Sequence, residues 1–226
     1  MYKYSSKDME KYLVIGMATR QGFAHVPTFY SVCYAAMKLG RIPVFFCSGK
    51  GKPEDGSNGY NIGRNDVMEQ IRNNFPGLKT VRMFWLDDDN IIMNPDEVME
   101  VLQTAIKNYW NVTFKYHSIA GEKIINNVWR RTPENAEAAG NKYGKNWTSM
   151  TDEQIESLAK EQGTDYPVID GAGLGSCYIE LPTDYKFHFD EAQGEDFHLW
   201  DDEYLGKREL GCAYKPKTGH WKSFPI

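Results

Sequence analysis

Residues 81–90 read Val-Arg-Met-Phe-Trp-Leu-Asp-Asp-Asp-Asn, an apolar run that ends in three consecutive acids. A short apolar run of this kind is typical of a buried strand. Three adjacent carboxylates repel one another, and hard oxygen ligands suit Mg²⁺ or Mn²⁺. The stretch therefore predicts a buried strand that delivers Asp87 and Asp89 to a metal ion, with Asp88 on the other side of the extended backbone. The alternative for the acids is a solvated turn or a helix cap.

Apolar runs and helical patterns alternate on both sides of this stretch. The pattern predicts strands at residues 12–18, 42–47 and 111–117, and helices from Thr28 to Gly40, from Ile62 to Asn73 and from Pro95 onward. This alternation predicts an α/β fold with a largely parallel sheet. In such sheets ligands bind at the carboxyl ends of the strands. Thr19, Arg20 and the acidic triplet all follow such ends, so one crevice can collect them.

The second half of the chain has a different character. Residues 130–165 are polar and contain one clear helix, which begins at the capping box Thr151–Gln154 and ends at Gly163. Residues 168–181 return to small and apolar side chains. The glycine run Gly171–Gly175 is not a dinucleotide fingerprint, because a strand rather than a helix is predicted to follow it.

Composition and charge limit the classes of function. The 226 residues carry 26 basic and 31 acidic side chains, a net charge of −5, which disfavours general binding to phosphate backbones. No stretch approaches the ~20 apolar residues of a membrane span, and the N-terminus lacks the apolar run of a signal peptide. We therefore expect a cytoplasmic protein whose four widely separated cysteines stay reduced.

Two motifs near the C-terminus add candidate chemistry. Glu195 and Asp196 precede an amphipathic stretch, so they are predicted at a helix start, where a carboxylate acts as a general base or simply caps the helix. His220 follows much later. A late histidine alone is an ordinary surface or core residue, but its neutral imidazole suits Mn²⁺ if a metal needs a third protein ligand.

Taken in order, these segments resemble the nucleotide-sugar glycosyltransferases of the GT-A fold, most of all their compact viral or prokaryotic members. The matching pieces are the first strand with Ala18-Thr19-Arg20, Gly63-Arg64-Asn65, the DxD motif at Asp87–Asp89, the small-residue acceptor strand Gly171–Ser176, the Glu-Asp motif at Glu195-Asp196, and Gly219-His220. The resemblance implies one GT-A domain over 1–226, Rossmann-like with a mostly parallel sheet. Residues 1–117 would bind the nucleotide sugar. Residues 118–226, with the polar excursion 130–165, would bind the acceptor.

The resemblance also implies roles for individual residues. Asp87, Asp89 and His220 would hold Mn²⁺ or Mg²⁺. The nucleotide sugar, a UDP- or GDP-sugar, would contact a further set: Thr19, Arg20, Arg64, Asp87, Asp88 and Lys222. Asp196 would be the catalytic base of an inverting transferase, and Glu195 would orient the acceptor or hold the loop.

The acceptor and the activity itself stay open at the level of sequence. The acceptor would offer a hydroxyl and can be a glycan, a protein, a small molecule or a hydroxylated nucleic-acid base. The location would be the cytoplasm, or the host cytoplasm for a viral protein. Two alternatives are a non-catalytic carbohydrate- or nucleotide-binding protein on the same fold and a metal-dependent phosphodiesterase, which would need two metals and more acidic or histidine ligands.

Overall fold

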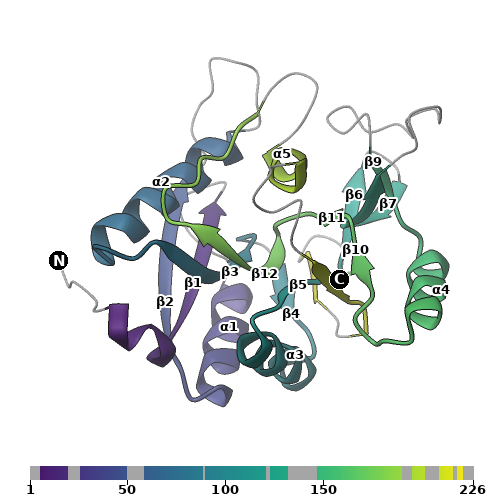
Figure 1. The fold of residues 1–226 in the computed structure, drawn as a ribbon, viewed down its shortest axis with the longest axis horizontal. Coiled ribbons are helices and arrows are strands. Elements are labelled where there is room, and N and C mark those ends of the chain that lie inside the picture. Colours follow the sequence, from purple (N-terminus) through teal and green to yellow (C-terminus); the bar gives the residue numbers. More distant parts are fainter. Residues whose placement is uncertain are drawn as a thin grey trace.

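A seven-stranded mixed sheet forms the centre of the molecule (Figure 1). The computed structural model describes residues 6–19, 26–49, 59–88, 90–120, 123–131, 147–189, 195–201, 209–215 and 218–220. In spatial order the central strands are β10 (Val168–Ile169), β13 (Leu210–Ala213), β5 (Asn111–Phe114), β12 (Ser176–Pro182), β3 (Thr80–Leu86), β1 (Tyr12–Thr19) and β2 (Ile42–Gly49). Five of these strands share one direction, and β12 and β10 run against them.

Helices and three small sheets complete the described structure. The helices are η1 (Ser6–Lys11, a 3-10 helix), α1 (Val26–Lys38), α2 (Tyr60–Asn74), α3 (Pro95–Asn108), α4 (Asp152–Gln162) and α5 (Glu195–Asp201). The small sheets are β11 (Gly171–Ala172) with β8 (Val128–Arg131) and β9 (Trp147–Ser149), β14 (Thr218–His220) with β4 (Asn90–Ile92), and β6 (His117–Ala120) with β7 (Lys123–Asn126). Among the described helices, none is long and apolar enough to cross a membrane.

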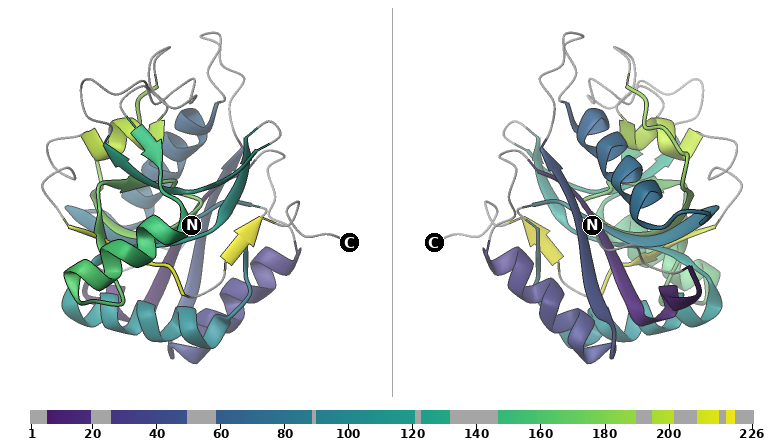
Figure 2. Two further views of the ribbon diagram at one scale, coloured as in Figure 1. Left: turned by 90° about the vertical axis from the view of Figure 1, so that its right-hand side faces the viewer. Right: turned by 90° about the vertical axis from the view of Figure 1, so that its left-hand side faces the viewer.

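The sheet separates two apolar layers, which explains why β1 is almost entirely apolar. Along β1, Leu13, Ile15 and Met17 face α1 and α3 in one buried cluster. Val14 belongs to the other cluster, which contains side chains of α2. Figure 2 shows α2 on the opposite side of the sheet from α1 and α3. A strand covered on both faces has no polar side, so it reads as a continuous apolar run.

Most of the predicted elements are present. The strands predicted at 12–18 and 42–47 are β1 and β2, the apolar run before the acids is β3, and the three predicted helices are α1, α2 and α3. The capping box is confirmed, because Thr151 Oγ1 accepts from the Gln154 N–H and Gln154 Oε1 accepts from the Thr151 N–H. Gly163 ends α4 in the left-handed conformation, with φ 65°.

Two features differ from the expected sheet. The strand predicted over 111–117 leaves the central sheet after Phe114, because the Tyr116 N–H is bound by the side-chain Oδ1 of Asn127 at 2.7 Å and not by a neighbouring strand. The second difference is β12, which lies antiparallel between β3 and β5. The turn before β12 lies where β3 ends, so β12 must run back along β3.

Candidate functional site

The candidate site lies at the carboxyl end of β3, where three distant segments meet. Asp87 follows β3, Arg64 is in the first turns of α2, and Asp196 is in the first turn of α5. Nη1 of Arg64 lies 3.2 Å from Oδ1 of Asp196, and Nη2 lies 3.9 Å from Oδ1 of Asp87. The Arg64 side chain is 5% exposed and the two carboxylates about a fifth, so one guanidinium faces two partly desolvated acids.

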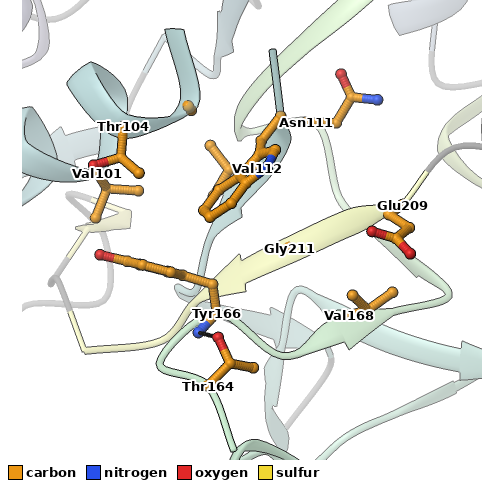
Figure 3. A pocket seen from close by; sticks show the side chains of 11 residues that line it. Val101, Thr104, Asn111, Val112, Thr164, Tyr166, Val168, Glu209 and Gly211 are labelled. Atoms are coloured by element: carbon orange, nitrogen blue, oxygen red, sulfur yellow. Dashed lines mark hydrogen bonds between the residues drawn. The ribbon is translucent and has the colours of Figure 1, made fainter. Parts of the chain in front are cut away.

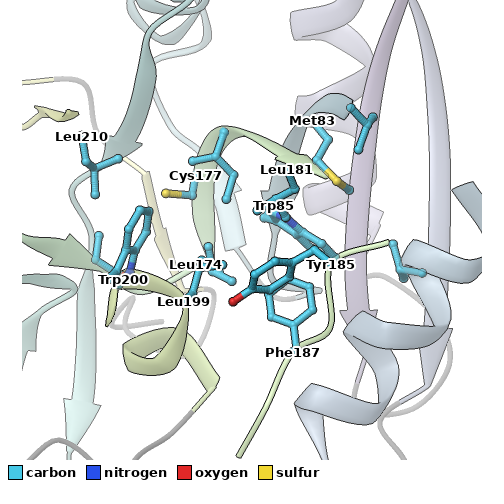
Figure 4. Packing of buried hydrophobic residues seen from close by; sticks show 14 of the residues in the cluster. Met83, Trp85, Leu174, Cys177, Leu181, Tyr185, Phe187, Leu199, Trp200 and Leu210 are labelled. Atoms are coloured by element: carbon cyan, nitrogen blue, oxygen red, sulfur yellow. The ribbon is translucent and has the colours of Figure 1, made fainter. Parts of the chain in front are cut away.

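Arg64 is held by its neighbours on α2 and by aromatic rings. Its guanidinium carbon lies 5.6 Å from the ring centroid of Trp85 and 5.9 Å from that of Phe187. The next residue, Asn65, binds the backbone of Phe187 twice: its Nδ2 donates to the carbonyl at 2.9 Å, and its Oδ1 accepts from the N–H at 2.7 Å. Asn65 therefore fixes the segment after β12 against α2, which keeps the Phe187 ring beside Arg64. Figure 4 shows Phe187 packed beside Trp85.

Asp196 is positioned by the packing of α5. Phe197 and Trp200 are buried, and the Trp200 indole N–H donates to the Ala172 carbonyl at 2.6 Å. Phe197 packs on Trp129, with ring centroids 4.3 Å apart. With α5 anchored on this cluster beside β11, Oδ2 of Asp196 accepts from the Leu174 N–H at 3.2 Å. One carboxylate oxygen is thus oriented by the backbone and the other by Arg64.

The turn from Gly173 to Gly175 brings the chain close to these acids. The Asp87 N–H donates to the Gly175 carbonyl at 3.0 Å, and Nδ2 of Asn90 donates to the same oxygen at 2.7 Å. A Cβ on Gly175 would lie less than 3.0 Å from both Oδ2 of Asp87 and the hydroxyl of Tyr116. Only glycine fits there, so the small-residue stretch is explained by close approach of side chains to backbone.

Tyr116 is a site residue that the sequence reasoning missed. Its backbone is fixed by Asn127, which receives its N–H and donates to its carbonyl. Burial raises the pKa of the Tyr116 phenol well above its usual range, and the charges of Asp87 and Asp196 raise it further, against the opposing charge of Arg64. The phenol is therefore neutral and offers a hydrogen-bond donor. The available signal was its position just after β5, which is a strand end like that of Asp87.

The other predicted residues have different outcomes. Thr19 ends β1, is fully buried, and its hydroxyl has no hydrogen-bond partner within the described part of the chain. Asp88 is 4% exposed. The backbone of His220 pairs with Asn90 in the β14–β4 ladder, which sets it next to the end of the acidic triplet. Arg20, Asp89 and Lys222 lie outside the described residues, as do the side chains of Glu195 and His220.

The described side chains alone do not complete a metal site. No three His, Cys, Asp or Glu side chains within the described ranges gather around one point. Asp87 and Asp196 carry two negative charges against the one positive charge of Arg64. This carboxylate excess is the kind of oxygen-donor setting that suits a hard divalent cation.

Comparisons with known proteins give a structural similarity. No protein family model matches the sequence, and no curated protein matches it. The crystal structure of S. aureus TarS 1–349 in complex with UDP-GlcNAc is similar to this chain with a TM-score of 0.35 and 11% sequence identity. The match covers 96% of this chain and 62% of the TarS chain, so this chain spans less than two thirds of the length of the TarS chain. Similarity at this level establishes neither a shared fold nor a shared activity.

Proposed function

We propose that the protein transfers a sugar from a nucleoside-diphosphate sugar to an acceptor hydroxyl, with a divalent metal ion and with inversion at the anomeric carbon. The observation that carries this proposal is the meeting of Arg64, Asp87 and Asp196, which come from three segments far apart in the sequence. The reaction needs positive charge for a diphosphate leaving group and a carboxylate base for a hydroxyl. Arg64 supplies the positive charge, and the carboxylates of Asp87 and Asp196 lie within ion-pair distance of it.

On the donor side, Arg64 would contact the diphosphate directly, and the acidic triplet would act on it through a divalent metal ion. Asp87, Asp89 and His220 would hold Mn²⁺ or Mg²⁺, and the backbone pairing of His220 with Asn90 supports this grouping. The bound ion would supply Lewis-acid stabilisation of the leaving diphosphate. Thr19, Arg20, Asp88 and Lys222 would contact the remainder of a UDP- or GDP-sugar.

On the acceptor side, Asp196 would take the proton. Its Oδ2 is already oriented by the Leu174 N–H, so the carboxylate needs little reorganisation when a hydroxyl arrives. Tyr116 would donate a hydrogen bond toward the reacting groups from its neutral phenol, and Glu195 would orient the acceptor. The acceptor class is a hydroxyl of a glycan, a protein, a small molecule or a hydroxylated nucleic-acid base.

A thermal-shift titration tests the donor half of the proposal. UDP and GDP are titrated with and without Mn²⁺ against the wild type, Asp87→Asn and the matched surface control Asp184→Asn, whose residue is exposed. A ligand at 100 times its dissociation constant stabilises by about 2.7 kcal/mol, and each kcal/mol raises the Tm of a domain this size by about 2–4 °C. We expect a Mn²⁺-dependent shift that Asp87→Asn loses and Asp184→Asn keeps.

Two outcomes would contradict the donor half. One is that neither nucleotide shifts the wild type in the presence of Mn²⁺, and the other is that Asp87→Asn responds like the wild type. Product analysis then separates the enzyme classes. A transferase releases the nucleoside diphosphate, a phosphodiesterase releases the nucleoside monophosphate with a sugar phosphate, and a non-catalytic binder leaves the donor intact.

A further inference from the structure

A cavity lies at the opposite end of the central sheet from the candidate site. Figure 3 shows the side chains that line it. It has a volume of about 210 Å³ and lies between α3, the first residues of β5, the segment that joins α4 to β10, and the start of β13. Because β3, β5 and β13 share one direction, the starts of β5 and β13 are remote from the strand ends that carry Asp87 and Tyr116. The cavity is therefore a second, separate feature.

Two aromatic rings form part of the wall. The rings of Trp110 and Tyr166 have centroids 6.1 Å apart and planes at 60°, so they form a corner rather than a stack. Trp110 is 46% exposed and Val168 is 39% exposed, so solvent reaches the cavity wall at both residues. Aliphatic side chains of α3 and β5, Val101 and Val112, supply much of the remaining surface.

The charge that the described residues place on the cavity wall is negative. Among the described residues that line it, Glu209 is the one that carries a charge, and it is exposed. Asp165 and Glu100 lie close enough to Tyr166 for their charges to add to the effect of burial and raise the pKa of its phenol, against Lys215. Lys215 itself is ion-paired with Asp165. A neighbouring guanidinium, that of Arg82, donates to the Trp110 carbonyl at 2.5 Å and does not line the cavity. An anionic ligand is disfavoured here.

Three polar groups of the wall are engaged within the protein. The Thr104 hydroxyl donates to the Glu100 carbonyl at 3.0 Å, and the Thr164 hydroxyl accepts from the Tyr166 N–H at 3.1 Å. Asn111 Oδ1 accepts from the Glu180 N–H at 3.0 Å. An alkylated ammonium group needs only aromatic faces, apolar contact and a nearby carboxylate.

We propose that this cavity binds a small organic cation, an alkylated ammonium group held between Trp110, Tyr166 and Glu209. At roughly 30 Å³ per water, the volume corresponds to about seven water molecules and is below the ~300–1,000 Å³ of sites for drug-sized ligands. A trimethylammonium head fits this scale, whereas a nucleotide does not. This site is independent of the proposed transferase activity, and its test measures ligand binding rather than enzymatic turnover.

The test compares choline with its uncharged carbon analogue, 3,3-dimethylbutan-1-ol, at constant ionic strength. Binding is followed by ¹H–¹⁵N NMR, using the indole N–H of Trp110, assigned through Trp110→Leu. We expect choline to shift this resonance and the neutral analogue to bind several-fold more weakly. Glu209→Gln should weaken choline binding by about 2–5-fold, and Trp110→Leu, read from neighbouring amides, by about 2–30-fold. Glu156→Gln, an exposed acid on α4, is the matched control and should bind like the wild type.

Three results would overturn the proposal. The neutral analogue could bind as well as choline, choline could leave the Trp110 resonance and its neighbours unshifted up to saturating additions, or a methyl glycoside could bind there in its place. Thermal melts of the variants identify any loss of fold. Because Glu209 is exposed, Glu209→Gln keeps the fold and decides the role of the charge even if Trp110→Leu is destabilised.

Discussion

The substitution Gly175→Ala tests the geometry of the candidate site with a single methyl group. The backbone of Gly175 does not have the positive φ of Gly40, Gly59, Gly77 and Gly163, so alanine is sterically allowed by the chain itself. The conflict is with side chains, since the methyl carbon would lie under 3.0 Å from Asp87 Oδ2 and from the Tyr116 hydroxyl. Ordinary contact begins at 3.4 Å, so these oxygens must retreat by about an ångström.

The expected size of the effect follows from that displacement. Overpacking of a well-packed site costs about 1–3 kcal/mol of unfolding free energy. For a chain of 226 residues this lowers the Tm by roughly 2–12 °C. Misplacing reacting groups by ~1 Å lowers turnover by about 10²-fold. Thermal melts give the first quantity, and release of nucleoside diphosphate from the donor gives the second.

Gly40→Ala is the matched control for this experiment. Gly40 has φ 64° and no atom within 4 Å of an added Cβ, so alanine there costs about 1–2 kcal/mol through the backbone alone. It should lower the Tm similarly but leave turnover at the wild-type level. If Gly175→Ala keeps both the wild-type Tm and the wild-type turnover, then Asp87 and Tyr116 do not lie against this glycine and the site geometry is wrong.

Three further predictions concern charge and thiol chemistry. Arg64→Ala leaves two partly buried carboxylates without their shared guanidinium, so the free energy of unfolding should fall by about 3 kcal/mol. The affinity for a nucleoside diphosphate, measured by calorimetry, should fall by about tenfold or more. An unchanged affinity would make Arg64 purely structural. Burial raises the pKa of Cys177 to about 12, so iodoacetamide should modify it only after denaturation, and native-state alkylation seen by mass spectrometry would contradict its burial. Burial alone would raise the pKa of Asp152, but Lys115 and Asn126 outweigh it and hold that pKa below its usual value. A carboxyl whose pKa is lower in the folded than in the unfolded state stabilises the fold at pH values above the unfolded pKa. Asp152→Asn should therefore lower the free energy of unfolding by under about 1 kcal/mol at neutral pH, and in denaturant titrations this loss should shrink below about pH 4. A difference between variant and wild type that does not change with pH would refute this.

Local patterns were sufficient to predict many of the elements. β1 is a nearly continuous apolar run and β3 ends in one, Met83–Leu86, because these residues are covered on both faces. The start and stop signals of α4 lie in its own sequence. The strand-end rule also directed attention to Asp87, since a polar residue directly after a buried strand reaches the ligand-binding edge of the sheet.

What the sequence did not predict depends on pairing between distant segments. The position of β12 between β3 and β5 is set by hydrogen bonds across the sheet and leaves no periodic signal of its own. The two hydrogen bonds between the Asn65 side chain and the Phe187 backbone join residues 122 positions apart. In the sequence, nothing distinguishes Tyr116 from the other aromatic residues. Its place in the site follows from the close approach of its hydroxyl to Gly175, which only the structure shows.

Turnover by Asp196→Asn is the most direct test of the central claim, that Asp196 is the base of an inverting sugar transfer. Asparagine keeps the shape of the side chain and its bond from the Leu174 N–H, but it cannot take the proton. We predict that donor and Mn²⁺ binding persist while turnover falls by about 10²–10⁴-fold, with Asp184→Asn at the wild-type rate, and that NMR of the wild-type product shows inversion at the anomeric carbon. Near-normal turnover by Asp196→Asn, or a product that retains the anomeric configuration of the donor, would contradict the account.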